Sequence, residues 1–262
     1  MRSLAMEFVD IAAARGRSGL VLVVSGLVPS PWSEAAKGIS HVKGLNAAIV
    51  RGKPRDPELE AWTRSHNVPV AMYQDEPPRT GWAEILMLCE RLSEQVPLVP
   101  SDPARRCKLF GLGHELAGEG GFGWCARLLT IDGSLRSEGA RGFPLKVAKY
   151  LAKKYGYAPE RVPAARAKVE SVIAVLSAEL ERSRAVGHPY VLGDTLSALD
   201  IYCAAFSVLL VGAPEADCPA MPGEFRPIFS YLKEDLGITT PRALLEHRTF
   251  MHSRHLPWPL TL

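Results

Sequence analysis

The sequence has few cysteines, and none of them lies at the spacing of a paired site. The five cysteines form no CxxC pair and are odd in number, so neither a disulfide framework nor a zinc ribbon is indicated. We expect free thiols in a reducing compartment, the cytoplasm. His247, His252 and His255 have no Cys or carboxylate at ligand spacing, and HELAGE at 114–119 lacks the second histidine of the HExxH motif. We therefore predict no metal site.

Long apolar runs and an excess of one charge are also missing. The longest apolar stretch, residues 19–28, is too short to cross a bilayer. Residues 1–18 carry acidic residues and no signal-peptide pattern. The 31 basic and 28 acidic residues are interspersed and give a formal charge of +3. We therefore expect neither a membrane nor a nucleic-acid partner.

The first part of the chain has the pattern of an α/β domain. Residues 1–18 predict a helical extension, a short amphipathic helix stopped by Gly16. Over residues 19–98 strands and helices alternate as βαβα and then βα, with room for a hairpin strand. Strands are predicted at 19–25, 46–50 and 68–73, with helices at 33–43 and 81–92. This order is the outline of a thioredoxin-like domain.

Three prolines between residues 97 and 103 mark a change in the chain. Asp102 is placed to cap a helix whose first position is Pro103. Almost every periodic segment after this point is helical, which predicts an all-helical domain over residues 101–262. Helices are predicted at 104–117, 144–155, 164–185, 197–211 and 240–252.

The tetrapeptide Ser30-Pro31-Trp32-Ser33 lies where the first predicted strand gives way to a helix. Many redox domains carry Cys-Pro-x-Cys at this point, because a helix N-terminus lowers the pKa of a thiol. Serine cannot exchange disulfides, but its hydroxyl can donate a hydrogen bond. Our hypothesis is that Ser30 holds the thiolate of another molecule. We interpret Ser33 as the helix N-cap and as the second choice for that contact.

A second motif, YVLGDTLSALDIYCAAF, covers residues 190–206. Ser197 is placed to cap a helix, and Asp200 can reach back to the N–H of the cap. This predicts a capping box at the start of a buried helix, where both donors would otherwise be unpaired.

The two motifs, with Val68-Pro69 before the third strand and PSDPARR at 100–106, resemble the cytosolic glutathione transferase superfamily over roughly residues 19–250. The resemblance implies the glutathione transferase fold, reduced glutathione as co-substrate and a homodimer. It places Ser30 on the catalytic Ser or Cys of the family. It places Val68 and a cis Pro69 on the pair that binds the cysteinyl part of glutathione.

The resemblance also suggests contacts to the ends of glutathione. The family's Glu/Gln–Ser pair, which grips the γ-glutamyl group, is replaced here by Thr80-Gly81, and Arg79 comes just before. Arg79 and Thr80 are the candidates to hold that carboxylate, although an ordinary surface turn is an open alternative. Lys53 and His66 are candidates for the glycyl end, with solvated surface as the alternative.

Residues 118–123, GEGGFG, formally match GxGxxG, but no strand precedes them. We therefore predict a helix break rather than a dinucleotide fingerprint. In the family the helical domain supplies most of an apolar pocket for the second substrate. We assign Trp32, Phe122, Trp124 and Arg127 to that pocket, with packing in the helical core as the alternative.

The predicted function is activation of the glutathione thiol for attack on a small apolar or aromatic electrophile, by conjugation, ether cleavage or isomerisation. Ser30 with Val68-Pro69 favours this enzyme. Thr80-Gly81 favours an alternative, a non-catalytic protein of the same fold that binds a small molecule or a partner protein. A helix-entry serine without a ligand is the alternative for Ser30, and a trans edge-strand proline for Pro69.

Overall fold

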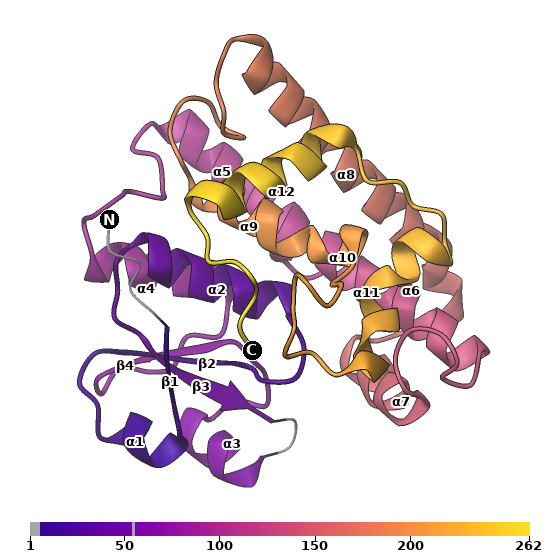
Figure 1. Ribbon diagram of the computed structural model, residues 1–262, viewed down its shortest axis with the longest axis horizontal. Coiled ribbons are helices and arrows are strands. Elements are labelled where there is room, and N and C mark those ends of the chain that lie inside the picture. The colour runs from indigo at the N-terminus through magenta and orange to yellow at the C-terminus, as the bar shows by residue number, and fades with distance from the viewer. Residues whose placement is uncertain (1–5, 54–55) are drawn as a thin grey trace.

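The computed structural model describes residues 6–53 and 56–262. Its sheet has four strands in the order β1-β3-β2-β4 (Figure 1). The strands are β1 (Glu7–Val9), β2 (Leu20–Ser25), β3 (Ala48–Gly52) and β4 (Val70–Tyr73). Strands β1 and β2 pair parallel with β3, and β4 pairs antiparallel with β2. An isolated bridge between Ala71 and Arg79 supplies the short return of the hairpin.

The central strand β2 is covered on both faces. Leu22 and Val24 point into the core that includes α2 (Pro31–Val42) and α4 (Trp82–Leu92). Val21 and Val23 point to the opposite face, which α1 (Ile11–Arg15) and α3 (Pro57–Thr63) cover (Figure 1). Successive side chains of a strand face opposite sides, so a strand buried on both faces needs a continuous apolar run. The run at 19–25 meets that need.

The prediction of one helix in the N-terminal extension, residues 1–18, is wrong at Glu7–Val9. These residues form β1 and extend the sheet beside β3, and only Ile11–Arg15 is helical. The Arg51 guanidinium of β3 lies 4.0 Å from the Phe8 ring and helps to fix the strand. Pairing with a distant strand decided the structure here, and local periodicity does not report such pairing. Residues 1–5 of the predicted extension lie outside the described residues.

The rest of the chain is helical, and the predicted fold class is confirmed. Its helices are α5 (Pro103–Ala117), α6 (Phe122–Arg136), α7 (Leu145–Lys154), α8 (Val162–Ala185), α9 (Ala198–Phe206), α10 (Val208–Val211), α11 (Arg226–Glu234) and α12 (Arg242–Arg254), with 3-10 turns η1 (Pro159–Arg161) and η2 (Gly223–Phe225). The helix break predicted at 118–123 separates α5 from α6. Nearly all of α6 is buried, so it has no amphipathic period and was not among the predicted helices. The domain boundaries at 18, 98 and 101 stay predictions.

The start of α9 is built around the fully buried Asp200 carboxylate. It accepts hydrogen bonds from the Ser197 N–H at 2.9 Å, the Ser197 hydroxyl at 2.7 Å and the Val191 N–H at 2.8 Å. The His247 Nε2 of α12 lies 3.3 Å from the same carboxylate. The predicted return of Asp200 to the cap N–H is therefore confirmed.

Helix α9 also joins the helical part to the sheet part. A Cβ on Gly38 of α2 would lie 2.9 Å from the Ile201 side chain, so the two helices approach where α2 has no side chain. The Tyr202 hydroxyl donates to the Trp82 carbonyl at the start of α4 at 2.9 Å. Both contacts lie on one short helix, so α9 holds α2 and α4 in place.

Residues 256–262 return across the sheet part. The Lys37 ammonium donates to the Thr261 carbonyl, and the Arg51 Nε donates to the Leu262 carbonyl at 2.8 Å. The Trp258 ring lies 4.3 Å from the His252 ring. This C-terminal segment therefore ties α12 to α2 and β3.

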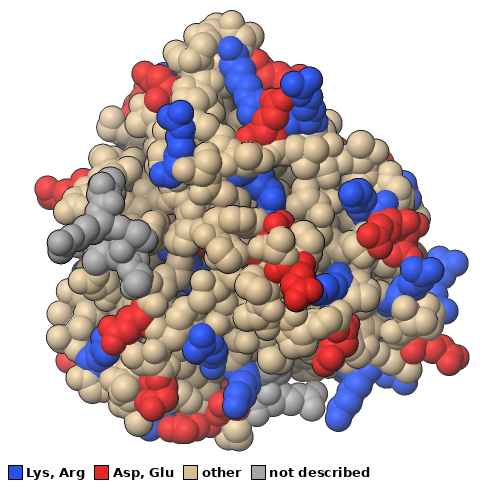
Figure 2. Space-filling view, viewed as in Figure 1, with Lys and Arg blue, Asp and Glu red and all other residues tan. Residues whose placement is uncertain are grey.

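Figure 2 shows Lys and Arg interspersed with Asp and Glu on the visible face. No described helix combines the length and the apolar composition that crossing a bilayer requires.

We predict that Asp200→Ala lowers the free energy of unfolding by about 3 kcal/mol or more, because three buried donors lose their acceptor. Urea unfolding followed by circular dichroism measures this. Asp194→Ala, which removes an exposed carboxylate of the same motif, is the control and should change the value by less than about 0.5 kcal/mol. Equal effects of the two substitutions would contradict the central place of Asp200.

A second prediction concerns acid. Burial, and then the charge of Arg248, lower the pKa of His252 to about 4 from its ordinary 6.5. Between these pH values the unfolded chain binds a proton that the folded chain does not, so stability falls as pH drops from about 6.5 to about 4.

His252→Gln should flatten this loss, measured as the urea midpoint at a series of pH values across that window. His66→Gln, at an exposed histidine, is the control and should leave the loss as it is. An unchanged profile in His252→Gln would show that another group titrates.

Candidate active site

Ser30 lies at the N-cap of α2, just after the end of β2. Its N–H donates to the Val28 carbonyl at 2.8 Å, and its carbonyl accepts from the Glu34 N–H at 2.9 Å. The residue is only 8% exposed, yet its hydroxyl makes no hydrogen bond to any described residue. Pro31 has no N–H, so Trp32 and Ser33 supply the first amides of the helix. Together these groups form a small set of donors around one point.

Ser33 has a different place from the one expected. The prediction that it caps α2 is wrong, because the helix begins at Pro31 with Ser30 as its cap. Ser33 is fully buried, and its Oγ accepts from the Ser25 N–H at 3.1 Å. This bond fastens the helix to the strand. The contact to the cofactor assigned to Ser33 has no support from this geometry.

The Val68–Pro69 peptide bond is cis, as expected. It directly precedes β4, whose first residue, Val70, lies opposite Val23 in the register of β2 and β4. Because these strands are antiparallel, the beginning of β4 lies at the same end of the sheet as the end of β2. Pro69 and the Ser30 turn therefore flank one end of the sheet.

Arg79 does not have the free guanidinium that the predicted carboxylate grip requires. Its backbone pairs with Ala71, and its side chain bonds to Glu76 at 3.0 Å and to the Pro77 carbonyl. The Arg79 side chain is therefore bound within its own turn and does not extend toward a ligand. Local charge pairing within the turn is the physical reason.

The N-terminus of α4 has its own anion. The Glu84 carboxylate accepts from the Gly81 N–H at 2.9 Å and from the Thr80 N–H at 3.3 Å. Under the resemblance this helix terminus would receive the γ-glutamyl carboxylate. Thr80 therefore contributes its backbone N–H to this terminus. A ligand carboxylate would compete with Glu84 for the N–H groups of Thr80 and Gly81.

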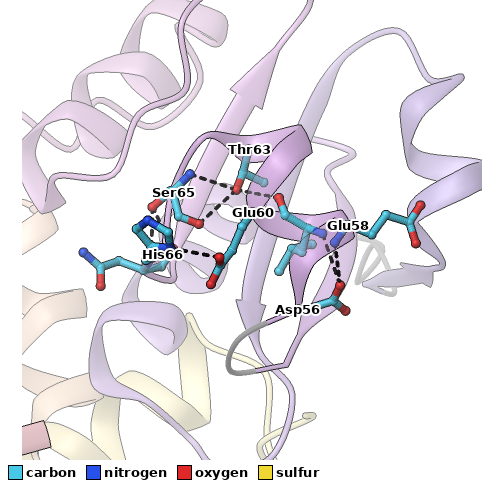
Figure 3. A network of polar contacts seen from close by, with 8 residues as sticks. Asp56, Glu58, Glu60, Thr63, Ser65 and His66 are labelled. Carbon is cyan, nitrogen blue, oxygen red and sulfur yellow. Dashed lines mark hydrogen bonds and ion pairs between the residues drawn. The ribbon is translucent and has the colours of Figure 1, made fainter. Parts of the chain in front are cut away.

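Lys53 and His66 lie on the edge of the sheet part. Lys53 is exposed after β3 and makes no polar contact with a described residue. His66 is exposed and lies 3.0 Å from the Glu60 carboxylate, toward which its ring points in Figure 3. The same view shows Asp56 capping α3 and Thr63 bonded to its own helix and turn. This network accounts for the polar residues there without a ligand.

Trp32 projects from the first turn of α2 toward the break between α5 and α6. Its Nε1 donates to the Ala117 carbonyl at 2.8 Å, and its ring meets the Phe206 ring edge-on at 4.9 Å. A Cβ on Gly123 would lie 2.5 Å from Phe206 and 2.9 Å from Trp32. A glycine is therefore required for α6 to approach the two rings. The predicted break serves to bring α6 beside the Ser30 helix.

The other predicted pocket residues separate into two groups. Phe122 is fully buried and lines a small cavity between helices with Leu116, Phe206 and others, a position that fits the core alternative, and its assignment to the substrate pocket stays a prediction. Trp124 is partly buried against Tyr155, with ring centres 4.5 Å apart. Arg127 is brought to Trp32, at 5.9 Å from its ring.

Two neighbours of Arg127 were missed from the sequence. Phe143, in the segment before α7, lies 5.4 Å from the guanidinium, and the charge of Arg127 acts on Lys154 of α7. Neither residue belongs to a motif. Only the packing of α7 beside α6 brings them there.

The buried thiols of Cys89 and Cys203 are poor candidates for a nucleophile. Burial raises the pKa of Cys89 to about 12 and raises that of Cys203 well above its ordinary value. Thiolates, not thiols, react. The described residues contain no group of three or more His, Cys, Asp or Glu side chains suited to a metal ion.

No protein-family model matches the sequence, and no curated protein matches it either. Solved structures do match. A glutathione S-transferase domain-containing protein of Marinobacter aquaeolei is 14% identical with a TM-score of 0.59, covering 89% of this chain and 98% of its own. A glutathione S-transferase of Methylobacillus flagellatus, solved with glutathione bound, is 14% identical with a TM-score of 0.57, covering 90% of this chain and 95% of its own.

A third similar structure is the beta-etherase LigF of a Sphingobium strain. It is 17% identical with a TM-score of 0.56, covering 88% of this chain and 99% of its own. The matches span both the sheet part and the helical part. The chain therefore has the fold of the glutathione transferase superfamily.

Proposed function

We propose that this protein activates the thiol of glutathione at Ser30 for attack on a small apolar or aromatic electrophile. The observation that carries the proposal is the Ser30 hydroxyl, which is nearly buried at a helix N-cap and makes no hydrogen bond to a described residue. The glutathione bound to the Methylobacillus flagellatus protein of the same fold supports the choice of thiol. A cytoplasmic homodimer is part of the proposal and rests on the family resemblance.

The chemistry follows from the donors around Ser30. A free thiol, with a pKa of about 8.5, is mostly protonated at neutral pH. The Ser30 O–H and the amides of Trp32 and Ser33 would favour the thiolate. A hydrogen bond to a charged group contributes about 1.5–3 kcal/mol, and one pKa unit corresponds to about 1.4 kcal/mol. The pKa of the bound thiol would therefore fall by about one to two units.

In a conjugation, the thiol proton goes to solvent and the sulfur lone pair forms a bond to the electrophilic carbon. The leaving group departs with the electron pair of the broken bond. Ether cleavage is the same displacement with an alkoxide or phenoxide leaving, and isomerisation adds and then expels the same sulfur. Ser30 stabilises the charge on sulfur and forms no covalent bond.

A second candidate is a non-catalytic protein of this fold that binds a small molecule or a partner protein. The Glu84 carboxylate at the N-terminus of α4 favours it, because this anion stands where the resemblance would place the γ-glutamyl carboxylate. Under this candidate Ser30 is a helix-entry residue only.

Ser30→Ala should raise the pKa of bound glutathione by about one to two units, which lowers the thiolate fraction, and with it turnover, near pH 7 by about eightfold to twenty-five-fold. Calorimetric titration with glutathione, with thiolate formation followed by ultraviolet absorbance across pH, measures the effect. Ser40→Ala is the control, because Ser40 lies in the same helix and only bonds to the Leu45 carbonyl. Absence of glutathione binding to the wild-type protein would overturn the proposal.

Glu84→Gln should tighten glutathione binding about twofold to tenfold, because it removes an anion that competes at the N-terminus of α4. The same titration measures the dissociation constant. Glu94→Gln, at an exposed carboxylate just beyond α4, should leave it unchanged. An unaltered affinity in Glu84→Gln would favour the second candidate.

A further inference from the structure

One buried cation stands apart from the other buried charges of the described residues. Five Lys, Arg, Asp and Glu residues are buried, and four of them have partners. Lys37 pairs with Glu34 at 2.9 Å, Lys43 with Glu90 at 2.8 Å, Asp132 accepts from the Tyr157 hydroxyl at 2.7 Å, and Asp200 accepts three hydrogen bonds. Arg127 has neither an ion pair nor a hydrogen bond with a described residue.

The guanidinium of Arg127 is held by rings alone. Arg127 as a residue is 9% exposed, and its Nε is fully buried and has no acceptor among the described residues. The rings of Trp32 and Phe143 lie 5.9 and 5.4 Å from it. These faces attract the charge, but they accept none of its five N–H donors in the way an oxygen does. A buried donor without a partner costs about 1–3 kcal/mol, so this arrangement needs an explanation.

A second cation lies close by. Partial desolvation, and then the charge of Arg127, lower the pKa of Lys154. The Lys154 ammonium lies 5.7 Å from the Tyr155 ring, which packs on Trp124. Two positive charges therefore share one region walled by aromatic rings, and no described carboxylate neutralises Arg127.

This region adjoins the proposed thiol site. Trp32 is two residues beyond Ser30, in the first turn of the helix that Ser30 caps, and its ring contacts the Arg127 guanidinium. Ser30 and Arg127 are therefore linked through a single residue, Trp32.

We propose that Arg127, assisted by Lys154, binds a carboxylate on the second substrate, so that the electrophile is an apolar or aromatic molecule with a carboxylate at one end. A guanidinium presents two parallel donors that match the two oxygens of a carboxylate. The aromatic walls match the apolar body. The role of this molecule as an electrophile rests on the proposed function, whereas its binding at Arg127 does not.

The test of binding uses two unreactive probes of the same shape, 4-methyl-3-nitrobenzoate and 4-methyl-3-nitrobenzamide. In calorimetric titrations the wild-type protein should bind the carboxylate about tenfold to a hundredfold more tightly than the amide. Arg127→Gln should reduce this preference to about onefold, and Arg127→Lys should keep part of it. Arg136→Gln, which removes an exposed arginine of the same helix, should keep all of it.

Thermal melting separates a binding role from a structural one. Removing an unpaired buried charge should leave the melting temperature of Arg127→Gln equal to that of the wild type or above it. Equal binding of the two probes by the wild-type protein would overturn the proposal. So would a carboxylate preference that survives in Arg127→Gln, or displacement of the benzoate by glutathione, which would assign Arg127 to a carboxylate of glutathione itself.

Catalysis distinguishes failure of this inference from failure of the proposed function. Glutathione and 4-chloro-3-nitrobenzoate form a carbon–sulfur bond and release chloride, as does the methyl ester of the same acid. If the protein conjugates both substrates, and Arg127→Gln does not change its preference for the acid over the ester, the proposed function stands and the carboxylate site at Arg127 is overturned. If the protein conjugates neither substrate but binds the benzoate more tightly than the benzamide, and Arg127→Gln abolishes that difference, the proposed function is overturned and the carboxylate site is supported.

Discussion

The buried carboxylate of Asp200 is the interaction on which both parts of the molecule depend. Taking a charge out of water costs several kcal/mol unless hydrogen bonds replace the lost hydration. Three donors and the His247 ring surround this one, and together they fix where α9 begins. Helix α9 in turn carries the residues that meet α2 at Gly38 and α4 at Trp82.

The site inherits its geometry from this helix. Phe206, at the end of α9, supports the Trp32 ring, and Gly123 of α6 passes beside both rings. Arg127 follows one turn later on α6, with its guanidinium 5.9 Å from the Trp32 ring. Trp32 therefore links the helix that Ser30 caps to the Arg127 guanidinium. Under the two proposals, this pair of sites would recognise a thiol and an anionic group.

The features that the sequence predicted well are those encoded within a few residues. The apolar run of β2, the turn at Ser30 and the return of Asp200 to Ser197 each depend on neighbours in the chain. Features that depend on distant partners were missed or wrong. Glu7–Val9 became a strand because β3 had a free edge, and Ser33 turned inward because the Ser25 N–H needed an acceptor.

The same distinction holds for the site. Arg127 could be nominated from its position after the glycine-rich break. Its lack of a carboxylate partner among the described residues depends on how the helices pack around it. Glu84 is the opposite case: it lies three residues after the cap residue Gly81, so its contact is local, and the spacing that signals it was overlooked. Whether a buried polar group such as the Arg127 guanidinium finds a partner depends on the assembled fold, so a single sequence does not report it.

The return of residues 256–262 across α2 and β3 has a consequence for biosynthesis. Arg51 and its acceptor Leu262 are 211 positions apart. At about 5–20 residues per second, the ribosome needs about 10 to 40 s to travel from one to the other. During that interval the Lys37 ammonium and the Arg51 guanidinium lack these carbonyl acceptors. Vectorial synthesis therefore supplies these partners of α2 and β3 well after the two elements themselves have been made.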